Sequence, residues 1–155
     1  MNKSLNACLA AALALPALGH ARPVVLTAQL QAYGGNGAYL AVYVTDAAGK
    51  YQKTLWVAGK KAKYYKHLSA WARGSALSAR EFDGVTGASV GSGKTLKVTV
   101  ELADTLIDAG YEIRVDSAVE DGRDYPADAR APLTKAGAGK PVKGRGYIKS
   151  LSYDM

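Results

Sequence analysis

The sequence predicts an all-β protein, built as an antiparallel two-sheet sandwich with one short amphipathic helix. Apolar and polar residues alternate with a period of two in several short segments, which is the pattern of half-buried strands. Turns that contain glycine separate these segments, as in sheets whose neighbouring strands run antiparallel. One segment lacks this alternation and has helical spacing instead.

Residues 1–21 have the features of a secretory signal peptide. Lys3 supplies a positive charge, residues 5–18 form an apolar run, and small residues precede a cleavage site after Ala21. The apolar run is shorter than the roughly 20 residues that span a bilayer. We therefore expect an exported, periplasmic protein that does not span the membrane, with residues 22–155 as a single mature domain.

Export restricts the chemistry of the mature domain. Cys8 is the only cysteine and leaves with the signal peptide, so neither a disulfide nor a thiol nucleophile is expected. His67 is then the only histidine, which argues against a metal site built on imidazole. The formal charge of +7 becomes +6 when Lys3 is removed. This balance favours anionic partners, and nucleic acid is not expected outside the cytoplasm.

The first half of the mature chain predicts three strands joined as a meander. Residues 24–33 and 39–45 alternate between two faces, with Leu and Val predicted inward, and a turn then leads into a third strand at 51–57. The connecting segments 34–37 and 46–50 are rich in Gly, Asn and Asp, the residues that form tight turns.

Residues 60–73 predict an amphipathic helix. Tyr64, Leu68 and Trp71 recur at spacings of four and three, and Gly74 is a signal for the end of a helix. The same segment carries the densest positive charge, which we call the helix patch. Its members are Lys60, Lys61, Lys63, Tyr64, Lys66, Trp71 and Arg73.

Two interpretations of the helix patch remain open from the sequence. It is either a surface for an anionic ligand, such as a flavin phosphate, a ferric chelate or a lipid headgroup, or a helix whose aromatic residues pack on the sandwich while its lysines stay solvated. His67, within the same segment, is expected to be a surface or packing residue because the sequence shows no nucleophile to partner it.

The second half of the chain resumes the alternation. Residues 96–102 and 111–116 predict strands, and Asp121-Gly122 predicts a hairpin turn. Residues 135–146, rich in Gly and Lys, predict a loop before a closing strand at 147–153. The number of short strands and turns favours a sandwich of the immunoglobulin-like kind.

The loop before the fourth predicted strand partly fits a phosphate-binding loop. Residues 88–95 match that motif except that Ala88 stands in place of the first glycine. The motif needs a following helix to complete the phosphate site, whereas residues 96–102 alternate as a strand. No nucleotide site of this kind is predicted.

The same loop fits a second motif better. The segment Asp83-Gly84-Val85-Thr86-Gly87-Ala88-Ser89 resembles the acceptor motif of proteins that carry covalent FMN, attached by a periplasmic FAD:protein FMN transferase. The resemblance implies that Ser89 takes the phosphoester, on a mobile loop shaped by Asp83, Thr86, Gly87 and Ala88. The simpler interpretation is a turn that leads into a strand and is capped by Asp83.

Acidic residues gather late in the chain but do not predict a metal site. Their spacing differs from the regular ligand spacing of a calcium loop, and Asp121-Gly122 already serves as a turn. They are Asp116, Glu120, Asp121, Asp124 and Asp128.

Taken in order, several features resemble the predicted periplasmic domain-of-unknown-function family 2271. They are the Leu55-Trp56 strand end, the basic helix at 60–71 and the loop at 83–89, followed by the segments 110–113 and 120–122. The resemblance covers nearly the whole mature chain. It implies a secreted β-sandwich and a genomic setting beside PepSY-type membrane reductases and FMN transferases linked to iron uptake.

Two classes of function follow. In the first, the protein is a periplasmic accessory of a redox or iron-acquisition system, which carries FMN on Ser89 or docks with a PepSY-type membrane reductase. In the second, it is a non-redox binding module that recognises an anionic ligand or a partner protein through residues 60–73. A hydrolase is disfavoured because the sequence offers no paired carboxylates, triad or metal set, and no catalytic residue is predicted.

Overall fold

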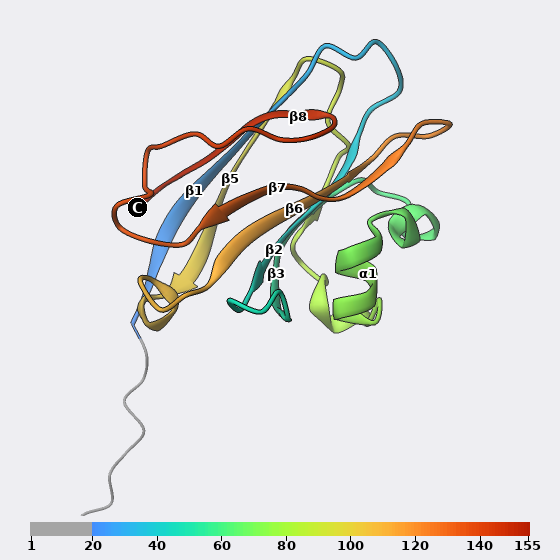
Figure 1. Cartoon of the computed structure of the whole chain (residues 1–155). Coiled ribbons are helices and arrows are strands. Elements are labelled where there is room, and N and C mark those ends of the chain that lie inside the picture. Colours follow the sequence, from blue (N-terminus) through green and yellow to red (C-terminus); the bar gives the residue numbers. More distant parts are fainter. Residues whose placement is uncertain (1–19) are drawn as a thin grey trace, which may run out of the picture.

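Two mainly antiparallel sheets packed face to face form the body of the protein, as the computed structural model shows for residues 20–155 (Figure 1). The predicted signal peptide lies outside these residues except for its last two. One sheet has the strand order β5-β1-β8 and the other β4-β3-β2-β6-β7, so the all-β sandwich is confirmed. The strands are β1 (Ala21–Leu30), β2 (Tyr39–Thr45), β3 (Tyr51–Ala58), β4 (Thr86–Gly87), β5 (Thr95–Ala103), β6 (Glu112–Ala118), β7 (Asp124–Pro132) and β8 (Ile148–Asp154).

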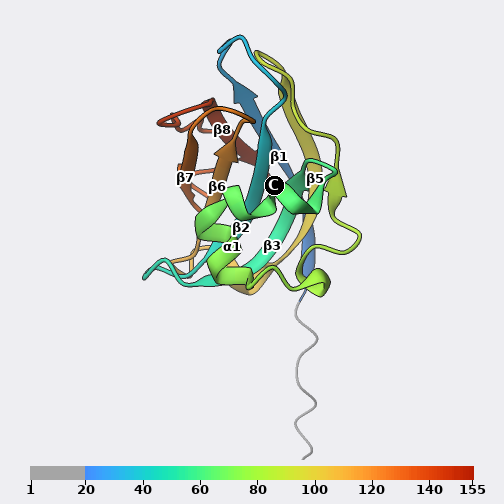
Figure 2. The same ribbon diagram turned by 90° about the vertical axis from the view of Figure 1, so that its right-hand side faces the viewer.

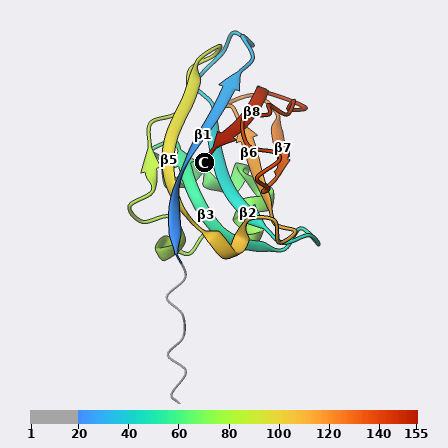
Figure 3. The same cartoon turned by 90° about the vertical axis from the view of Figure 1, so that its left-hand side faces the viewer.

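Figure 3 shows the β5-β1-β8 sheet in front of the larger sheet, and buried residues of both sheets form the main hydrophobic core. Leu26 and Leu30 of β1 point into it, as the alternation predicts, and meet Val42 of β2 and Ile113 of β6. Ala32, predicted on the same face as Leu30, is exposed because β1 ends at Leu30 and the chain turns away.

A second, smaller hydrophobic core, which we call the outer core, covers the outer face of the five-stranded sheet. Here α1 (Ser69–Ser75) and the 3₁₀ helix η1 (Ala62–His67) lie across the sheet, and Figure 2 shows α1 in front of β2 and β3. Ala41 and Tyr43 of β2 are buried beneath these helices, while Val42 faces the main core. β2 is therefore buried on both faces. An alternating pattern predicts a strand with only one buried face, so the sequence did not indicate this double burial.

The predicted continuous helix at 60–73 is wrong in its details. The chain forms η1, breaks its helical geometry at Leu68 (φ −84°, ψ 69°), and then forms α1. The buried residues are Tyr65, Leu68 and Trp71, so Tyr65 takes the inward position predicted for Tyr64. A spacing of three suits the 3₁₀ geometry of η1, which has three residues per turn.

The end of α1 also differs from the prediction. Gly74 was predicted to mark the end of the helix, but the helix continues to Ser75. Ala76, which follows it, adopts the left-handed conformation that often ends a helix. Gly74 serves another purpose, because a Cβ atom there would collide with the side chain of Tyr51 on β3. Its small size lets α1 approach the sheet closely.

β7 is a strand that the sequence analysis missed. It pairs with β6 through the hairpin turn predicted at Asp121-Gly122, where Asp121 has φ 60° and the Gly122 N–H donates to Val119 O at 2.9 Å. Two prolines and several alanines weaken the apolar alternation of β7, although Ala129 and Ala131 face the main core. The loop predicted at 135–146 and the closing strand are confirmed.

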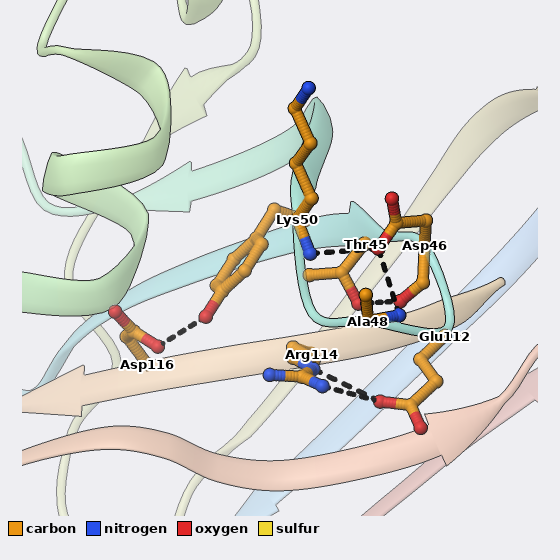
Figure 4. Close-up of polar contacts among 8 residues, drawn as sticks. Thr45, Asp46, Ala48, Lys50, Glu112, Arg114 and Asp116 are labelled. Atoms are coloured by element: carbon orange, nitrogen blue, oxygen red, sulfur yellow. Dashed lines mark hydrogen bonds and ion pairs between the residues drawn. The ribbon is translucent and has the colours of Figure 1, made fainter.

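A buried carboxylate, Asp116, joins the outer core to the hairpin. It accepts a hydrogen bond from the Tyr43 hydroxyl at 2.7 Å, which Figure 4 draws between the labelled Asp116 and the unlabelled tyrosine ring. It also accepts the Trp71 backbone N–H at 2.8 Å and the Ala127 N–H at 2.7 Å. Burial and the neighbouring Asp116 carboxylate raise the pKa of Tyr43 far above its usual value. Asp116 therefore has a structural role, with its oxygens occupied by protein donors.

The 46–50 turn follows the prediction made from its composition. Asp46 Oδ1 accepts the backbone N–H groups of Ala48 and Lys50, each at 2.9 Å (Figure 4). Beside this turn, Arg114 and Glu112 form an ion pair on the surface of β6, with Nη2 and Oε2 2.9 Å apart.

Candidate functional site

A cleft of about 530 Å³ lies beside the β6–β7 hairpin and brings together segments that are far apart in the sequence. We call it the hairpin cleft. Ser89, from the connection between β4 and β5, forms part of its wall, and η1 forms another part. Its principal lining residues are Tyr39, Lys61, Tyr64, His67, Ser89, the hairpin residues 118–122 and Asp124.

Ser89 is exposed between two segments that are tied to the sheet. On one side β4 pairs in parallel with β3, and the Gly59 N–H donates to Gly87 O at 2.8 Å. On the other side Val90 and Ala38 exchange two backbone hydrogen bonds, of 2.7 and 2.9 Å. The resemblance to the acceptor motif implies a mobile loop here, and in the structure backbone pairing holds the chain before and after Ser89.

Two glycines have steric roles next to this segment. A Cβ atom at Gly87 would lie 2.6 Å from Cζ2 of Trp56, so the glycine lets the indole pack beneath β4. A Cβ atom at Gly37 would lie 2.7 Å from the Ser89 Oγ atom. The glycine of the acceptor motif thus has a packing explanation that is independent of any modification.

The remaining motif residues lie at the surface. Asp83, Thr86 and Ala88 are exposed and do not line the hairpin cleft. The predicted cap by the Asp83 carboxylate is not found among the hydrogen bonds of residues 20–155, where Asp83 contributes its backbone N–H to Ala79 O at 2.8 Å. Of the five predicted acceptor-loop residues, the structure brings only Ser89 to the cleft.

The helix patch divides into three groups. Lys61 and Tyr64 line the hairpin cleft and so lie in the same site as Ser89. Trp71 is fully buried in the outer core, where its Nε1 donates to Thr54 Oγ1 at 2.9 Å, so its predicted place in a ligand surface is wrong. The remaining members are exposed away from the cleft, and they are Lys60, Lys63, Lys66 and Arg73.

Aromatic rings form one wall of the hairpin cleft. Tyr39 and Tyr64 meet edge to face, with ring centroids 5.8 Å apart. The Tyr39 hydroxyl accepts the backbone N–H of Lys61 at 3.1 Å, and the buried Tyr65 hydroxyl donates to Gly59 O at 2.7 Å. These contacts attach the start of η1 to the ends of β2 and β3, and burial raises the pKa of Tyr65.

The hairpin side of the cleft is acidic. Glu120, Asp121 and Asp124 line it, and Asp124 Oδ2 lies 3.0 Å from His67 Nδ1, which joins the hairpin to η1. Sequence reasoning assigned these acidic residues and His67 no place in a site. His67 and Asp124 are 57 positions apart, and only their contact in the fold shows that they share a cleft.

The chemistry of the cleft follows from its two walls. Lys61 offers a positive charge, the tyrosines offer aromatic surface, and the hairpin offers carboxylate acceptors. With one lysine beside three carboxylates, this lining suits a small polar molecule that carries hydrogen-bond donors and a flat ring. Among residues 20–155, no group of three or more His, Cys, Asp or Glu side chains has the arrangement of a metal site.

Comparison with known proteins gives one match. Residues 21–150 match the model of the family described as "Predicted periplasmic protein (DUF2271)". No curated protein and no solved structure matches the chain. Within the described part of the chain, no helix is long and apolar enough to cross a membrane. Since the match covers most of the chain, this protein belongs to DUF2271, a family of predicted periplasmic proteins.

Proposed function

We propose that this protein is a periplasmic carrier of FMN, attached through its phosphate to the hydroxyl of Ser89 and held in the hairpin cleft. The observation that carries the proposal is the position of Ser89, which is exposed and lines this cleft. The cleft volume of about 530 Å³ lies within the range of small-molecule sites. Anchored backbone on both sides holds the hydroxyl in place beside it.

The lining residues fit the chemistry of FMN. Ser89 supplies a primary hydroxyl for a phosphoester, and Lys61 supplies a positive charge for the phosphate. Tyr39 and Tyr64 supply aromatic surface for a flat ring system, and the acidic hairpin supplies acceptors for hydroxyl and N–H groups. When bound, FMN would supply the electron-transfer chemistry, while the protein binds and orients it.

Attachment requires FAD and a transferase in the same compartment. The Ser89 Oγ atom forms a bond to the phosphorus of the FMN half of FAD, and the anhydride bond to the AMP half breaks. AMP leaves, and the hydroxyl proton passes to a base of the transferase or to water. No change in oxidation state occurs in this step.

The partner in electron transfer that the family resemblance implies is a PepSY-type membrane reductase. We propose that it docks on the exposed lysines of the helix patch outside the cleft, Lys60, Lys63 and Lys66. Lys63 and Lys66 lie on η1, which also supplies Tyr64 to the cleft wall, and Lys60 and Lys61 directly precede this helix. A partner bound there would be next to the proposed flavin.

The experiment is an intact-mass measurement of the exported protein, produced together with an FMN transferase. We expect the wild type to gain the mass of one FMN less one water, and Ser89→Ala to gain nothing. Ser89→Thr keeps a hydroxyl and is expected to retain the modification. Thr99→Ala is the matched control, because Thr99 is an exposed hydroxyl residue of β5 outside the cleft. An unmodified wild type beside an active transferase, or a modified Ser89→Ala variant, would refute the proposal.

A second function is favoured by a different observation. The combination of one lysine and three carboxylates in the cleft lining suits a zwitterionic or polar ligand held without a covalent bond, which corresponds to a non-redox binding module. The packing of Gly87 on Trp56 also accounts for the motif glycine without modification. A colourless protein that binds a small ligand saturably, and loses it on substitution of Lys61, would support this function over the first.

A further inference from the structure

We propose that a second cleft, between β7 and the loop that precedes β8, binds a phosphate group. This basic cleft has a volume of about 440 Å³ and is lined by Ala127, Asp128, Arg130, Lys143 and Arg145. It shares no lining residue with the hairpin cleft. The proposal is therefore independent of the proposed FMN attachment.

The basic cleft concentrates positive charge. Arg130, Lys143 and Arg145 are exposed around it, and none of the three belongs to a salt bridge within residues 20–155. Three like charges at one cleft repel one another, and a bound anion relieves that repulsion.

The one carboxylate of the basic cleft is occupied by neutral donors. Asp128 is buried, and its oxygens accept hydrogen bonds from the Ser117 hydroxyl at 2.6 Å and the Ile148 N–H at 3.1 Å. They also accept the backbone N–H groups of Arg145 and Gly146, each at 2.7 Å. Asp128 thus fixes the loop onto β7, and its hydrogen-bonding capacity is used by groups other than the three cationic side chains.

Arg145 is held in position by the backbone of β7. Its Nε donates to Ala127 O at 3.3 Å, and its Nη2 donates to the carbonyl oxygens of Ala127 and Pro126. The Nη1 atom has no acceptor in the described part of the chain, so two N–H groups of the guanidinium stay available to a ligand. A guanidinium fixed in this way loses less freedom when it binds an anion.

The backbone around Arg145 has an unusual conformation. Ala127 has φ 45°, a region that favours glycine, and its N–H donates to the buried Asp116 at 2.7 Å. Gly144 has no room for a side chain, because a Cβ atom there would collide with the Ile148 carbonyl oxygen. Strained or crowded backbone of this kind, kept in place by buried partners, is common at binding sites.

The charges indicate the class of ligand. The lining has three positive side chains and one negative side chain, Asp128, so two positive charges are not compensated. A phosphate dianion carries two negative charges and matches this excess better than a carboxylate does. The planar guanidinium groups of Arg130 and Arg145 suit two phosphate oxygens. The surrounding segment, residues 135–149, contains five lysines and arginines and no acidic residue, so it attracts anions at longer range.

The test is a calorimetric titration of the mature protein with inorganic phosphate at low ionic strength, with acetate as a monovalent comparison. We expect saturable phosphate binding that weakens roughly tenfold or more in the double variant Arg130→Gln/Lys143→Gln. The matched control is Lys140→Gln/Lys149→Gln, which removes the same charge from exposed residues of the same region outside the cleft lining. Its affinity is expected to stay close to that of the wild type.

The phosphate group can belong to a membrane lipid or to a soluble molecule, and a vesicle-binding experiment distinguishes these two sources. Binding to phosphatidylglycerol vesicles that is lost in Arg130→Gln/Lys143→Gln and competed by inorganic phosphate would identify a lipid headgroup. Phosphate binding without vesicle binding would identify a soluble phosphate-bearing molecule. Both results support the site. Absent phosphate binding, equal binding of acetate, or an equal loss in the control variant would overturn it, with thermal melts confirming that both double variants are folded.

Discussion

Ser89 Oγ and the α-carbon of Gly37 lie so close together that a Cβ atom at Gly37 would be only 2.7 Å from the hydroxyl oxygen. The two residues belong to the β1–β2 connection and to the segment before β5, which Ala38 and Val90 join by two hydrogen bonds. The absence of a side chain at Gly37 therefore makes the space in which the Ser89 hydroxyl lies.

This contact gives a steric test of the proposed attachment site. Gly37→Ala is expected to displace the Ser89 hydroxyl and to lower the yield of FMN attachment, measured by intact mass. Gly37 does not have a positive φ, so alanine causes no backbone strain and the fold should persist. Gly35→Ala is the control, because it lies in the same connection and its Cβ would meet only the Tyr33 ring, at 3.3 Å. Full modification of Gly37→Ala would contradict the prediction.

Lys61 gives a test of the charge in the hairpin cleft. Lys61→Gln is expected to weaken the binding of free FMN roughly three- to tenfold, because it removes the lysine that lines the cleft. The measurement is quenching of flavin fluorescence during titration of unmodified protein. Lys66→Gln, an exposed lysine of η1 outside the lining, should leave the affinity nearly unchanged. Equal effects of the two substitutions would indicate a general charge effect instead of a site.

Asp116 is expected to be essential for stability. Asp116→Asn leaves three donors, from Tyr43, Trp71 and Ala127, around a side chain that also brings its own N–H groups. The free energy of unfolding should fall by at least about 2 kcal/mol in urea denaturation. Asp124→Asn removes an exposed carboxylate of the His67 pair and should change it by about 0.5 kcal/mol or less. Similar losses in both variants would be inconsistent with this assignment.

The raised pKa of Tyr51 predicts that the folded protein loses stability at alkaline pH. Burial raises the pKa of its hydroxyl from 10 to about 12, and the hydrogen bond to Glu81 Oε2, at 2.7 Å, contributes to the rise. The unfolded chain ionises first as the pH passes 10, so the free energy of unfolding should decrease between pH 10 and 12. Below pH 10 both states are protonated and this contribution is fully present.

The check is urea denaturation across this pH range for the wild type and Tyr51→Phe. The substitution removes the Tyr51 contribution and keeps that of Tyr43, whose pKa is also raised, so the slope should become shallower without vanishing. Identical slopes would show that Tyr51 ionises alike in both states.

Export can be tested directly by N-terminal sequencing of the protein recovered from the periplasm. We expect Arg22 as the first residue. Cleavage there leaves the pairing of Arg22 with Leu102 and the contact of Arg22 Nε with Asp104 Oδ1, at 2.6 Å, within the mature domain. A mature protein that begins after Arg22 would have lost both contacts.

Local sequence patterns predicted most of the strands correctly. The alternation in residues 24–33 or 96–102 arises because one face of each strand meets the core, and this pattern can be read without knowledge of the neighbours. It failed for β7, whose prolines and alanines leave little contrast between its faces, and for η1, where the turn is tighter than that of an α-helix.

The sequence by itself determined the β-sandwich, the turns and the choice of Ser89 as the candidate for FMN attachment, since each depends on residues that are adjacent in the sequence. Only the tertiary structure decided that Ser89 shares a cleft with Lys61, that Trp71 is core, and that His67 meets Asp124. The parallel pairing of β4 with β3 and the folding of the β6–β7 hairpin beside η1 create these relationships. They depend on strand register and on packing between segments far apart in the chain, to which local periodicity is insensitive.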